Sequence, residues 1–422
     1  MARRLSPLHR HHITVAQRRM AALAGAVLLG LAAIAFARCG EAAQNLFARL
    51  ASAFPMVPFV VTPLAFAGVV WMTRRWWPAA RGSGIPQVMA ASHRPESQDQ
   101  GDLISLRTAM AKFGCTLAML LVGGSAGREG PTVQISAALM LAVHRWLRVP
   151  VLAGIIIAGG AAGVAAAFNT PLAGVAFAIE ELASAFEQKV AVLVMAAVMI
   201  SGLVSLGLTG DYVYFGAMSG SLPLGRMVIV APIAGILGGM AGGGFSRCLI
   251  AMGQSHHGWL VAIRARPIIL AGACGMIVAV TGFVSNGLSW GTGYETTRHL
   301  LMGQAAPVFF GPAKFIATLA TALSGAPGGI FAPSLSVGAG LGQLIAMAMP
   351  GNSAGAVVLL GMVGYFTGVV RAPMTSVIIM MEMTADRTMI LPLFATALIA
   401  DAVSAMVCRE KLYHALSRPF MA

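Results

Sequence analysis

The stretch Gly127-Arg128-Glu129-Gly130-Pro131 is followed 202 positions later by a similar stretch, Gly329-Ile330-Phe331-Ala332-Pro333. The same offset relates three further pairs: Phe168–Pro171 with Val370–Pro373, Glu180 with Glu382, and Ser83 with Ser285. Four landmarks in one register rarely arise by chance, so the sequence indicates one structural unit that occurs twice. Matching Gly and Pro breaks in two apolar repeats predict a transport protein whose site lies between the repeats, where short helices end inside the membrane.

The composition indicates a membrane protein. Of the 422 residues, 58% are hydrophobic and 10% are charged, and the mean hydropathy is +0.81, whereas soluble domains have about 25% charged residues. Six apolar stretches approach the roughly 20 residues that cross a bilayer as a helix: Met20–Ala37, Pro55–Thr73, Val151–Ala167, Val190–Thr209, Pro267–Phe283 and Ile390–Val407. Three others are too short to cross: Thr132–Val143, Leu172–Ile179 and Ser376–Met381. Because backbone breaks inside a membrane only where protein or water satisfies it, we expect an all-α polytopic protein with broken helices.

The formal net charge of +14 could suggest a nucleic-acid partner, but the basic residues lie at the ends of apolar segments and form no basic domain with interleaved aromatic residues. They precede the first span, follow the second and close the chain: Arg3, Arg4, Arg10, Arg18 and Arg19, then Arg74, Arg75 and Arg81, and last Arg409, Lys411 and Arg418. By the positive-inside rule all three regions, and hence both termini, are expected in the cytoplasm. No convincing cleavage site follows the first apolar run, so we expect it to be retained.

The sequence predicts three parts: a basic cytoplasmic segment over residues 1–19, a first membrane repeat over 20–220, and a second over 224–422 that ends in a short cytoplasmic tail. The longest polar loop inside a repeat is Ser92–Arg107. We expect no appended regulatory domain. The five cysteines lack CxxC spacing, so we expect neither a metal site nor a cofactor.

Three motifs resemble the anion-binding signatures of the CLC family of chloride channels and proton-coupled chloride transporters. They are Gly82–Pro86, with the sequence Gly-Ser-Gly-Ile-Pro, Gly127–Pro131 and Gly329–Pro333, and they occur in the family's order. The resemblance covers nearly the whole chain and implies a prokaryotic-type member without CBS domains, located in the inner (plasma) membrane. It further implies a homodimer with one pore per subunit, and an inverted repeat of tilted and broken helices. The implied partners are chloride, protons and the lipid bilayer.

Residues of these motifs suit a dehydrated halide. Such an ion is large and weakly basic, so several neutral donors can hold it and still release it. Helix N-termini favour an anion by about 0.3 to 1 kcal/mol each, and by up to about 2 kcal/mol when partly buried. Ser83 is expected to donate its hydroxyl, and Ile330 and Phe331 their backbone N–H groups. The supporting anion loops comprise Gly82, Gly84, Pro86, Gly127, Arg128, Gly130, Pro131, Gly329 and Pro333.

The resemblance adds the phenol of Tyr413, which would complete an inner gate together with Ser83. Each residue also has a simpler interpretation. Ser83 could be a helix cap, and Tyr413 an anchor at the membrane interface.

Glu129 is the residue that most requires an explanation. A carboxylate at the bilayer centre costs about 2.5 to 3.5 kcal/mol on insertion scales, so it needs a partner or a function. One interpretation is a salt bridge to Arg128. The favoured one is that the carboxylate occupies an anion position and leaves it when protonated, which makes Glu129 an external gate and a proton acceptor. Its repeat mate is Phe331, so only the first repeat carries this acid.

Two adjacent acids follow the segment Leu172–Ile179. Adjacent acids at a helix end are commonly solvent-exposed, and Glu180 matches Glu382 in the second repeat, which indicates a shared structural role. Glu181 has no acidic mate. It falls where proton-coupled CLC members carry an internal glutamate that passes protons toward the gate, so the resemblance implies a chloride/proton antiporter. A passive, voltage- or pH-gated chloride channel of the same fold is the alternative, with Glu181 as a structural acid.

The neighbouring residues favour chloride as the substrate. Ser83 and Gly130-Pro131 resemble chloride-type members, whereas nitrate-preferring relatives have Pro at the serine position and fluoride exporters differ in both motifs. An intramembrane enzyme is a third hypothesis, with Glu129, Glu382 and Asp401 as its acids. The sequence has no HExxH motif or intramembrane Ser/His pairing to support it, so we expect no enzyme and assign Glu382 and Asp401 to contacts with backbone or arginine.

Overall fold

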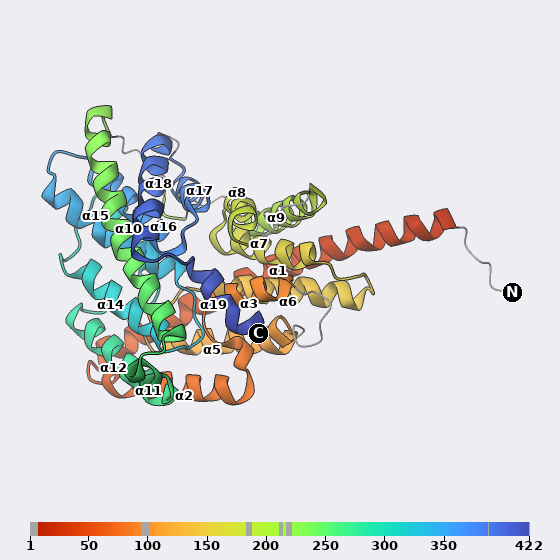
Figure 1. Ribbon diagram of the computed structural model, residues 1–422, viewed down its shortest axis with the longest axis horizontal. Coiled ribbons are helices and arrows are strands. Elements are labelled where there is room, and N and C mark those ends of the chain that lie inside the picture. Colours follow the sequence, from red (N-terminus) through yellow and green to blue (C-terminus); the bar gives the residue numbers. More distant parts are fainter. Residues whose placement is uncertain are drawn as a thin grey trace.

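The computed structural model of the chain describes residues 7–93, 102–182, 188–210, 214–216, 222–386 and 388–421. Within these ranges the named elements are all helices, long ones beside short ones (Figure 1). Six helices are long and apolar enough to cross a membrane: Met20–Ala53, Ala191–Leu208, Gly225–Gln254, Pro267–Val284, Phe331–Ala348 and Ile390–Val407. The expected all-α membrane class is confirmed. Arg3, Arg4 and residues 94–101 of the expected polar loop lie outside the described residues.

The helices of the first half are α1 (Pro7–Ala53), α2 (Pro58–Trp76), α3 (Ile85–His93), α5 (Leu106–Leu121), α6 (Glu129–Trp146), α7 (Ala153–Phe168), α8 (Pro171–Phe177) and α9 (Gln188–Thr209), with a 3-10 turn at Pro78–Ala80 and a π-helical turn at Ala178–Leu182. Those of the second half are α10 (Leu224–Gln254), α11 (Gly258–Arg264), α12 (Pro267–Val284), α13 (Tyr294–Leu301), α14 (Phe310–Leu323), α15 (Phe331–Ala348), α16 (Ala354–Val370), α17 (Pro373–Thr384), α18 (Ile390–Val407) and α19 (Leu412–Met421). At the 202-residue offset α6 matches α15 residue for residue, and α7 and α8 match α16 and the start of α17. The predicted boundary near residue 220 falls on residues 217–221, which lie outside the described residues.

Short helices occur where apolar segments were expected to be broken. Helix α8 has 7 residues and α17 has 12, and each starts with a proline. Helix α6 runs for 18 residues and is longer than its apolar stretch Thr132–Val143. It is longer because Gly130 and Pro131 lie in its first turn, where the N–H groups have no intrahelical acceptor and a proline therefore costs no hydrogen bond.

Contacts between the two halves are reciprocal at the motif loops. The N–H of Gly127 donates to the carbonyl of Gly329, and the N–H of Gly329 donates back to the carbonyl of Gly127, both at 2.7 Å. The two residues form an isolated antiparallel bridge. A contact that is unchanged when the two halves are exchanged is what a two-fold relation between repeats requires.

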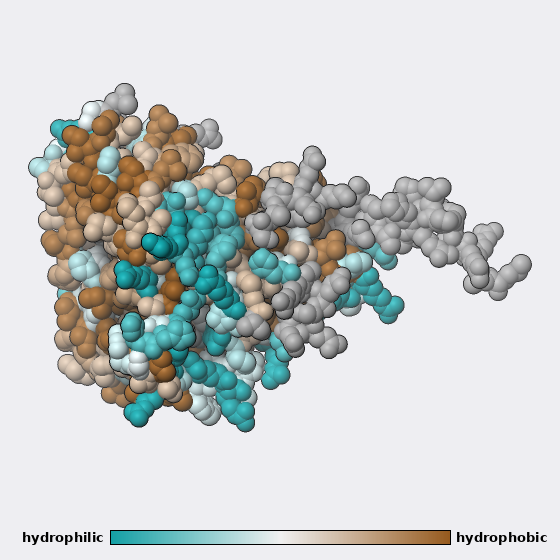
Figure 2. All heavy atoms as spheres, in the orientation of Figure 1, coloured by the Kyte–Doolittle hydropathy of each residue, from teal (hydrophilic) through white to brown (hydrophobic). Residues whose placement is uncertain are grey.

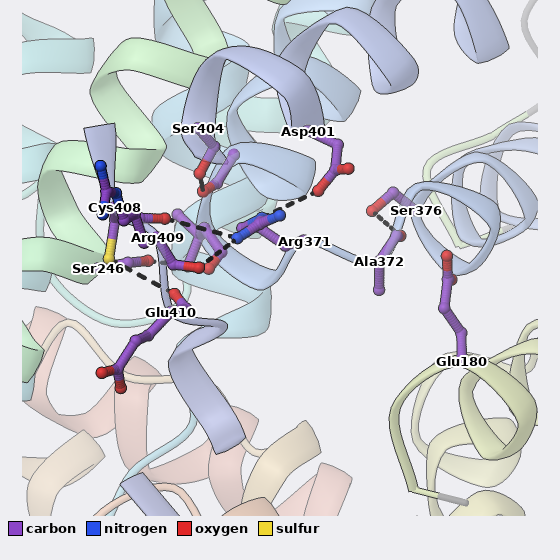
Figure 3. A network of polar contacts seen from close by, with 12 residues as sticks. Glu180, Ser246, Arg371, Ala372, Ser376, Asp401, Ser404, Cys408, Arg409 and Glu410 are labelled. Carbon is purple, nitrogen blue, oxygen red and sulfur yellow. Dashed lines mark hydrogen bonds and ion pairs between the residues drawn. The ribbon is translucent and has the colours of Figure 1, made fainter. Parts of the chain in front are cut away.

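Glu180 and Glu382 make a second reciprocal contact. Glu180 accepts hydrogen bonds from the backbone N–H groups at the start of α17, Met374 at 3.1 Å and Thr375 at 2.7 Å, and Figure 3 shows its side chain pointing at this helix next to Ala372. Glu382 on α17 accepts from the start of α8, Leu172 at 3.0 Å and Ala173 at 2.8 Å. Each carboxylate therefore caps a helix of the other half, and the predicted shared structural role is confirmed.

The centre of the molecule is closely packed, and its flanks are apolar. All residues of α16 from Gly355 to Val370 are buried, as are those of α7 from Gly154 to Phe168. In α9, α12 and α18 only 33% of the apolar window is buried, which leaves the rest exposed. Figure 2 shows polar residues gathered over the middle of one face, where Figure 1 places α3 and α19, with apolar residues on both flanks.

Candidate functional site

The three glycine-rich motifs meet at one place. The N–H of Gly328 donates to the carbonyl of Gly82 at 3.1 Å, which joins the first and third motifs. A methyl group at Gly84 would lie 2.8 Å from the carbonyl oxygen of Gly130, and one at Gly130 would lie 2.9 Å from that of Ser83. Gly84 also has a φ of +106°, a conformation that favours glycine. The glycines therefore allow a backbone-to-backbone approach that any side chain would prevent.

Three helices begin at this junction: α3 at Ile85, α6 at Glu129 and α15 at Phe331. Among the described residues, no acceptor binds the N–H groups of Ile330 and Phe331, so these donors are free to bind an anion. Ser83 Oγ accepts from the N–H of Ile85 at 3.3 Å and so caps α3. Accepting uses a lone pair and leaves the hydroxyl proton available, so the cap and the anion ligand are compatible roles for Ser83.

Phe331 and Tyr413 belong to a buried aromatic cluster. The ring of Phe331 is fully buried and packs against Phe168, Phe177, Phe366 and Tyr413, with ring centroids 4.9 to 6.1 Å away. Tyr413 is also fully buried, which argues against an anchor at the membrane interface. Its hydroxyl lies beside the side chain of Ser83. A buried phenol at the junction is suited to donate to an anion.

Glu129 lies in the first turn of α6 and is fully buried. One carboxylate oxygen accepts from the N–H of Ala332 in α15 at 3.4 Å, and the other has no hydrogen bond to any described residue. The carboxylate thus lies at the N-terminus of a helix from the other repeat, where an anion would bind. The alternative salt bridge to Arg128 is wrong, because Arg128 turns toward α1 and contacts the carboxylate of Glu41 at 3.1 Å and the carbonyl of Ala37 at 2.6 Å.

A cavity adjoins Arg128 and is lined in part by residues of α1, the helix toward which Arg128 turns. It has a volume of about 1040 Å³, and its lining includes Glu41, Arg128, Trp290 and Tyr294. The side chain of Glu41 is 62% exposed, whereas that of Arg128 is 6% exposed. The cavity therefore reaches Arg128, the residue that precedes Glu129 in the chain.

Glu181 lies in the π-helical turn after α8, and its side chain is completely buried. In the described part of the chain, its ionisable partner is His414, whose Nδ1 lies 3.5 Å from Glu181 Oε1. Neither carboxylate oxygen accepts a hydrogen bond from the described residues. Tyr413 lies within electrostatic range of both Glu181 and Glu129.

The other acids considered for an enzyme have structural contacts instead. Glu382 caps α8, as described above, and Asp401 accepts from Arg371 Nε at 3.0 Å (Figure 3). Arg371 also donates to the carbonyl of Arg409 at 3.0 Å. Arg371 thereby ties α16 and α18 to the segment before α19, the helix that carries Tyr413. The expected pairing of Glu382 with backbone and of Asp401 with arginine is confirmed.

Two buried lysines were missed in the sequence. Lys112 on α5 and Lys314 on α14 are both fully buried and lie 202 positions apart. Each ammonium group donates to three successive carbonyls: Lys112 to Ala80, Arg81 and Gly82 at 2.8, 3.3 and 2.7 Å, and Lys314 to Ser289, Trp290 and Gly291 at 3.0, 3.4 and 2.6 Å. Three N–H donors match three acceptors. Lys112 therefore holds the loop that carries Ser83, and the signal for it was a lysine inside an apolar helix at the repeat offset.

Comparisons with known proteins agree with this arrangement. A family model described as voltage gated chloride channel matches residues 64–405. Among solved structures, the chain is similar to a slow cyanobacterial Cl⁻/H⁺ antiporter, with 22% identity and a TM-score of 0.78 over 95% of this chain and 97% of that one. It is also similar to a CLC-type fluoride/proton antiporter, with 22% identity and a TM-score of 0.78 over 96% and 98%, and to a eukaryotic CLC transporter, with 21% identity and a TM-score of 0.76 over 95% and 74%. At these identities the structures establish a shared fold.

Proposed function

Because the chain belongs to the voltage-gated chloride channel, or CLC, family, we propose that it is an antiporter that moves chloride across a membrane in exchange for protons. Glu129 is the external gate and proton acceptor, and Glu181 transfers protons on the internal side. Chloride binds to the hydroxyls of Ser83 and Tyr413 and to the backbone N–H groups of Ile330 and Phe331. The glycines and prolines of the three motifs allow the helix N-termini to approach the ion.

The position of the Glu129 carboxylate is the observation that carries this proposal. It lies at the N-terminus of α15, where it accepts from the N–H of Ala332. Protonation removes the negative charge that the helix N-terminus attracts, so the side chain can leave and an anion can take its place. Because proton and anion then occupy the same site in alternation, their movements are coupled in opposite directions.

A passive chloride channel on the same fold is the second candidate. The channel is supported by the contact between Glu181 and His414, because a buried acid that pairs with a neighbouring side chain can have a purely structural role. Chloride is proposed over fluoride because Ser83 and Gly130-Pro131 are those of chloride-type members. Measuring both anions in the same assay decides between them.

The proposed setting is the inner (plasma) membrane, with both termini in the cytoplasm and two subunits per molecule, each with its own pore. The basic residues at the segment ends support the orientation, and family membership supports the homodimer. Cysteine labelling from each side of intact cells checks the orientation, and cross-linking in membranes checks the homodimer.

Purified protein reconstituted in liposomes tests the function. A chloride gradient is imposed without a proton gradient, the membrane potential is clamped near zero, and the external pH is recorded. We expect protons to move against chloride, and we expect Glu129→Gln and Glu181→Gln each to abolish proton movement. Asp401→Asn is the matched control, because it neutralises an acid with a structural partner. Chloride flux without proton movement would establish the channel, and no anion flux at all would overturn the functional assignment.

A further inference from the structure

We propose that His414 is a proton-transfer residue that connects the solvent to Glu181. This inference rests on the proposed antiport function and assigns the route by which protons reach the internal acid. The side chain of His414 is 52% exposed, that of Glu181 is 0% exposed, and the two are 3.5 Å apart. The pair therefore joins the solvent to the buried carboxylate through a single side chain.

Within the part of the chain that the structure describes, the surroundings of Glu181 leave few other routes. Both of its oxygens are sealed from solvent and accept no hydrogen bond from the described residues. Among the described residues, the other charged groups that act on it are Lys411 and Glu180. Glu180 already accepts from the N-terminus of α17, and a lysine ammonium gives up its proton only at high pH unless it is desolvated. Within the described ranges, His414 is thus the ionisable side chain in contact with Glu181, and an imidazole can accept a proton at one ring nitrogen and donate one from the other.

The imidazole geometry fits a two-sided transfer. A proton from the solvent binds at Nε2 of the neutral ring, which becomes an imidazolium with a proton on each nitrogen. The proton on Nδ1 then passes to Glu181 Oε1, which leaves a neutral imidazole and a neutral carboxylic acid. The 3.5 Å separation exceeds the roughly 2.6 to 3.2 Å of a proton-transfer contact, and a small side-chain rotation closes it.

The position of His414 is fixed by its neighbours on α19. Tyr413 before it and Ala415 after it are both fully buried. Gln254 on α10 donates to the carbonyl of Ala415 at 2.9 Å, and Arg371 holds the residues that precede the helix. The backbone of α19 is therefore anchored on both sides of His414, while the imidazole extends from it toward Glu181 and the solvent.

The liposome assay with His414→Gln tests the proposal, because glutamine keeps a polar side chain that cannot carry a proton at these pH values. General acid–base groups contribute roughly 100- to 10,000-fold, and water can partly replace a relay, so we expect proton transport to fall by about tenfold or more in weakly buffered solution. Chloride transport should fall with it and keep the wild-type stoichiometry. Added imidazole should restore the rate, and the rate should lose the pH dependence that histidine gives between about pH 5 and 8.

Two control variants separate proton transfer from other effects. Lys411→Gln removes a positive charge near Glu181 without removing the relay, and we expect it to change the rate by less than about fivefold. In His414→Gln combined with Glu181→Gln, imidazole should restore nothing. Chloride binding by calorimetry should be the same in wild type and His414→Gln, because the imidazole does not contact the anion site.

A wild-type rate and pH profile in His414→Gln would overturn the proposal, and so would a loss that imidazole does not restore in a protein that still binds chloride. Either result would leave the antiport function standing, because it depends on Glu129 and Glu181. If the wild-type protein itself moves no protons, the antiport function fails and the relay fails with it.

Discussion

Glu180 and Glu382 each cap a helix of the other half, and removing either carboxylate should lower the free energy of unfolding. The loss should be larger for the glutamate that accepts more hydrogen bonds. Glu382 accepts two backbone N–H groups, and Glu180 accepts two backbone N–H groups and the hydroxyl of Thr375 at 2.7 Å. An N-cap is worth about 0.5 to 2 kcal/mol, and hydrogen bonds to charged groups about 1.5 to 3 kcal/mol each. Since both sites are partly exposed and water replaces some of the loss, we expect Glu382→Ala to cost about 2 kcal/mol of unfolding free energy and Glu180→Ala about 3 kcal/mol.

Reversible unfolding in mixed detergent micelles, followed by circular dichroism, measures these differences. Thr375→Val provides the matched control, because it removes only the third hydrogen bond of Glu180 and should by itself cost about 1 kcal/mol. Glu180→Ala in the Thr375→Val background should then cost about as much as Glu382→Ala. If both glutamate variants fall within about 0.5 kcal/mol of wild type, as substitutions without structural contacts do, the capping argument is refuted.

Three further substitutions, one of them with a control variant, test other parts of the site. Gly84→Ala should abolish folded protein, measured by gel filtration, because its methyl group would meet the carbonyl of Gly130 and the backbone at this position has a φ of +106°. In the control Gly114→Ala, the methyl group meets nothing within 4 Å and should stabilise α5 by up to about 1 kcal/mol. Equal yields of the two variants would contradict this expectation. Lys112→Met leaves three buried carbonyls without their donor and should cost about 2 kcal/mol or more in the unfolding assay, and an unchanged stability would show that the lysine is not needed there. Arg371→Leu releases the segment before α19 and should weaken chloride binding in calorimetry by about 1 kcal/mol through Tyr413, so an unchanged affinity would rule out this positioning role.

The sequence predicted those features that recur at a fixed offset or in a compact motif. The loops Gly127–Pro131 and Gly329–Pro333, the matching of α6 with α15 and the shared role of Glu180 with Glu382 follow from positions 202 apart, whereas Gly82–Pro86 is a compact motif. Lys112 and Lys314 carried the same signal, but a single buried lysine shows its role only when the carbonyls around it are known. The local sequence does not reveal which of several acids will pair with a buried arginine.

Long-range pairings therefore required the structure. Arg128 pairs with Glu41, which lies 87 positions away, although Glu129 is its neighbour in the chain. The choice follows from geometry, because Glu129 is directed at the N-terminus of α15 while the guanidinium faces α1. The contact of His414 with Glu181 joins the last helix to a π-helical turn in the first repeat, and no periodicity or motif relates those two segments.

Pairing across the repeats separates structural residues from those that carry chemistry. Gly127 with Gly329, Glu180 with Glu382, and Lys112 with Lys314 make equivalent contacts in both halves. The two proposed proton-carrying acids break this symmetry: at the 202-residue offset Glu129 corresponds to Phe331, and Glu181 corresponds to Met383. An acid present in both halves would place two carboxylates near one anion site, where their mutual repulsion would oppose simultaneous ionisation and repel the anion. A symmetric scaffold with a single acid at each position instead gives the pathway two different ends, which is what directed exchange of an anion for a proton requires.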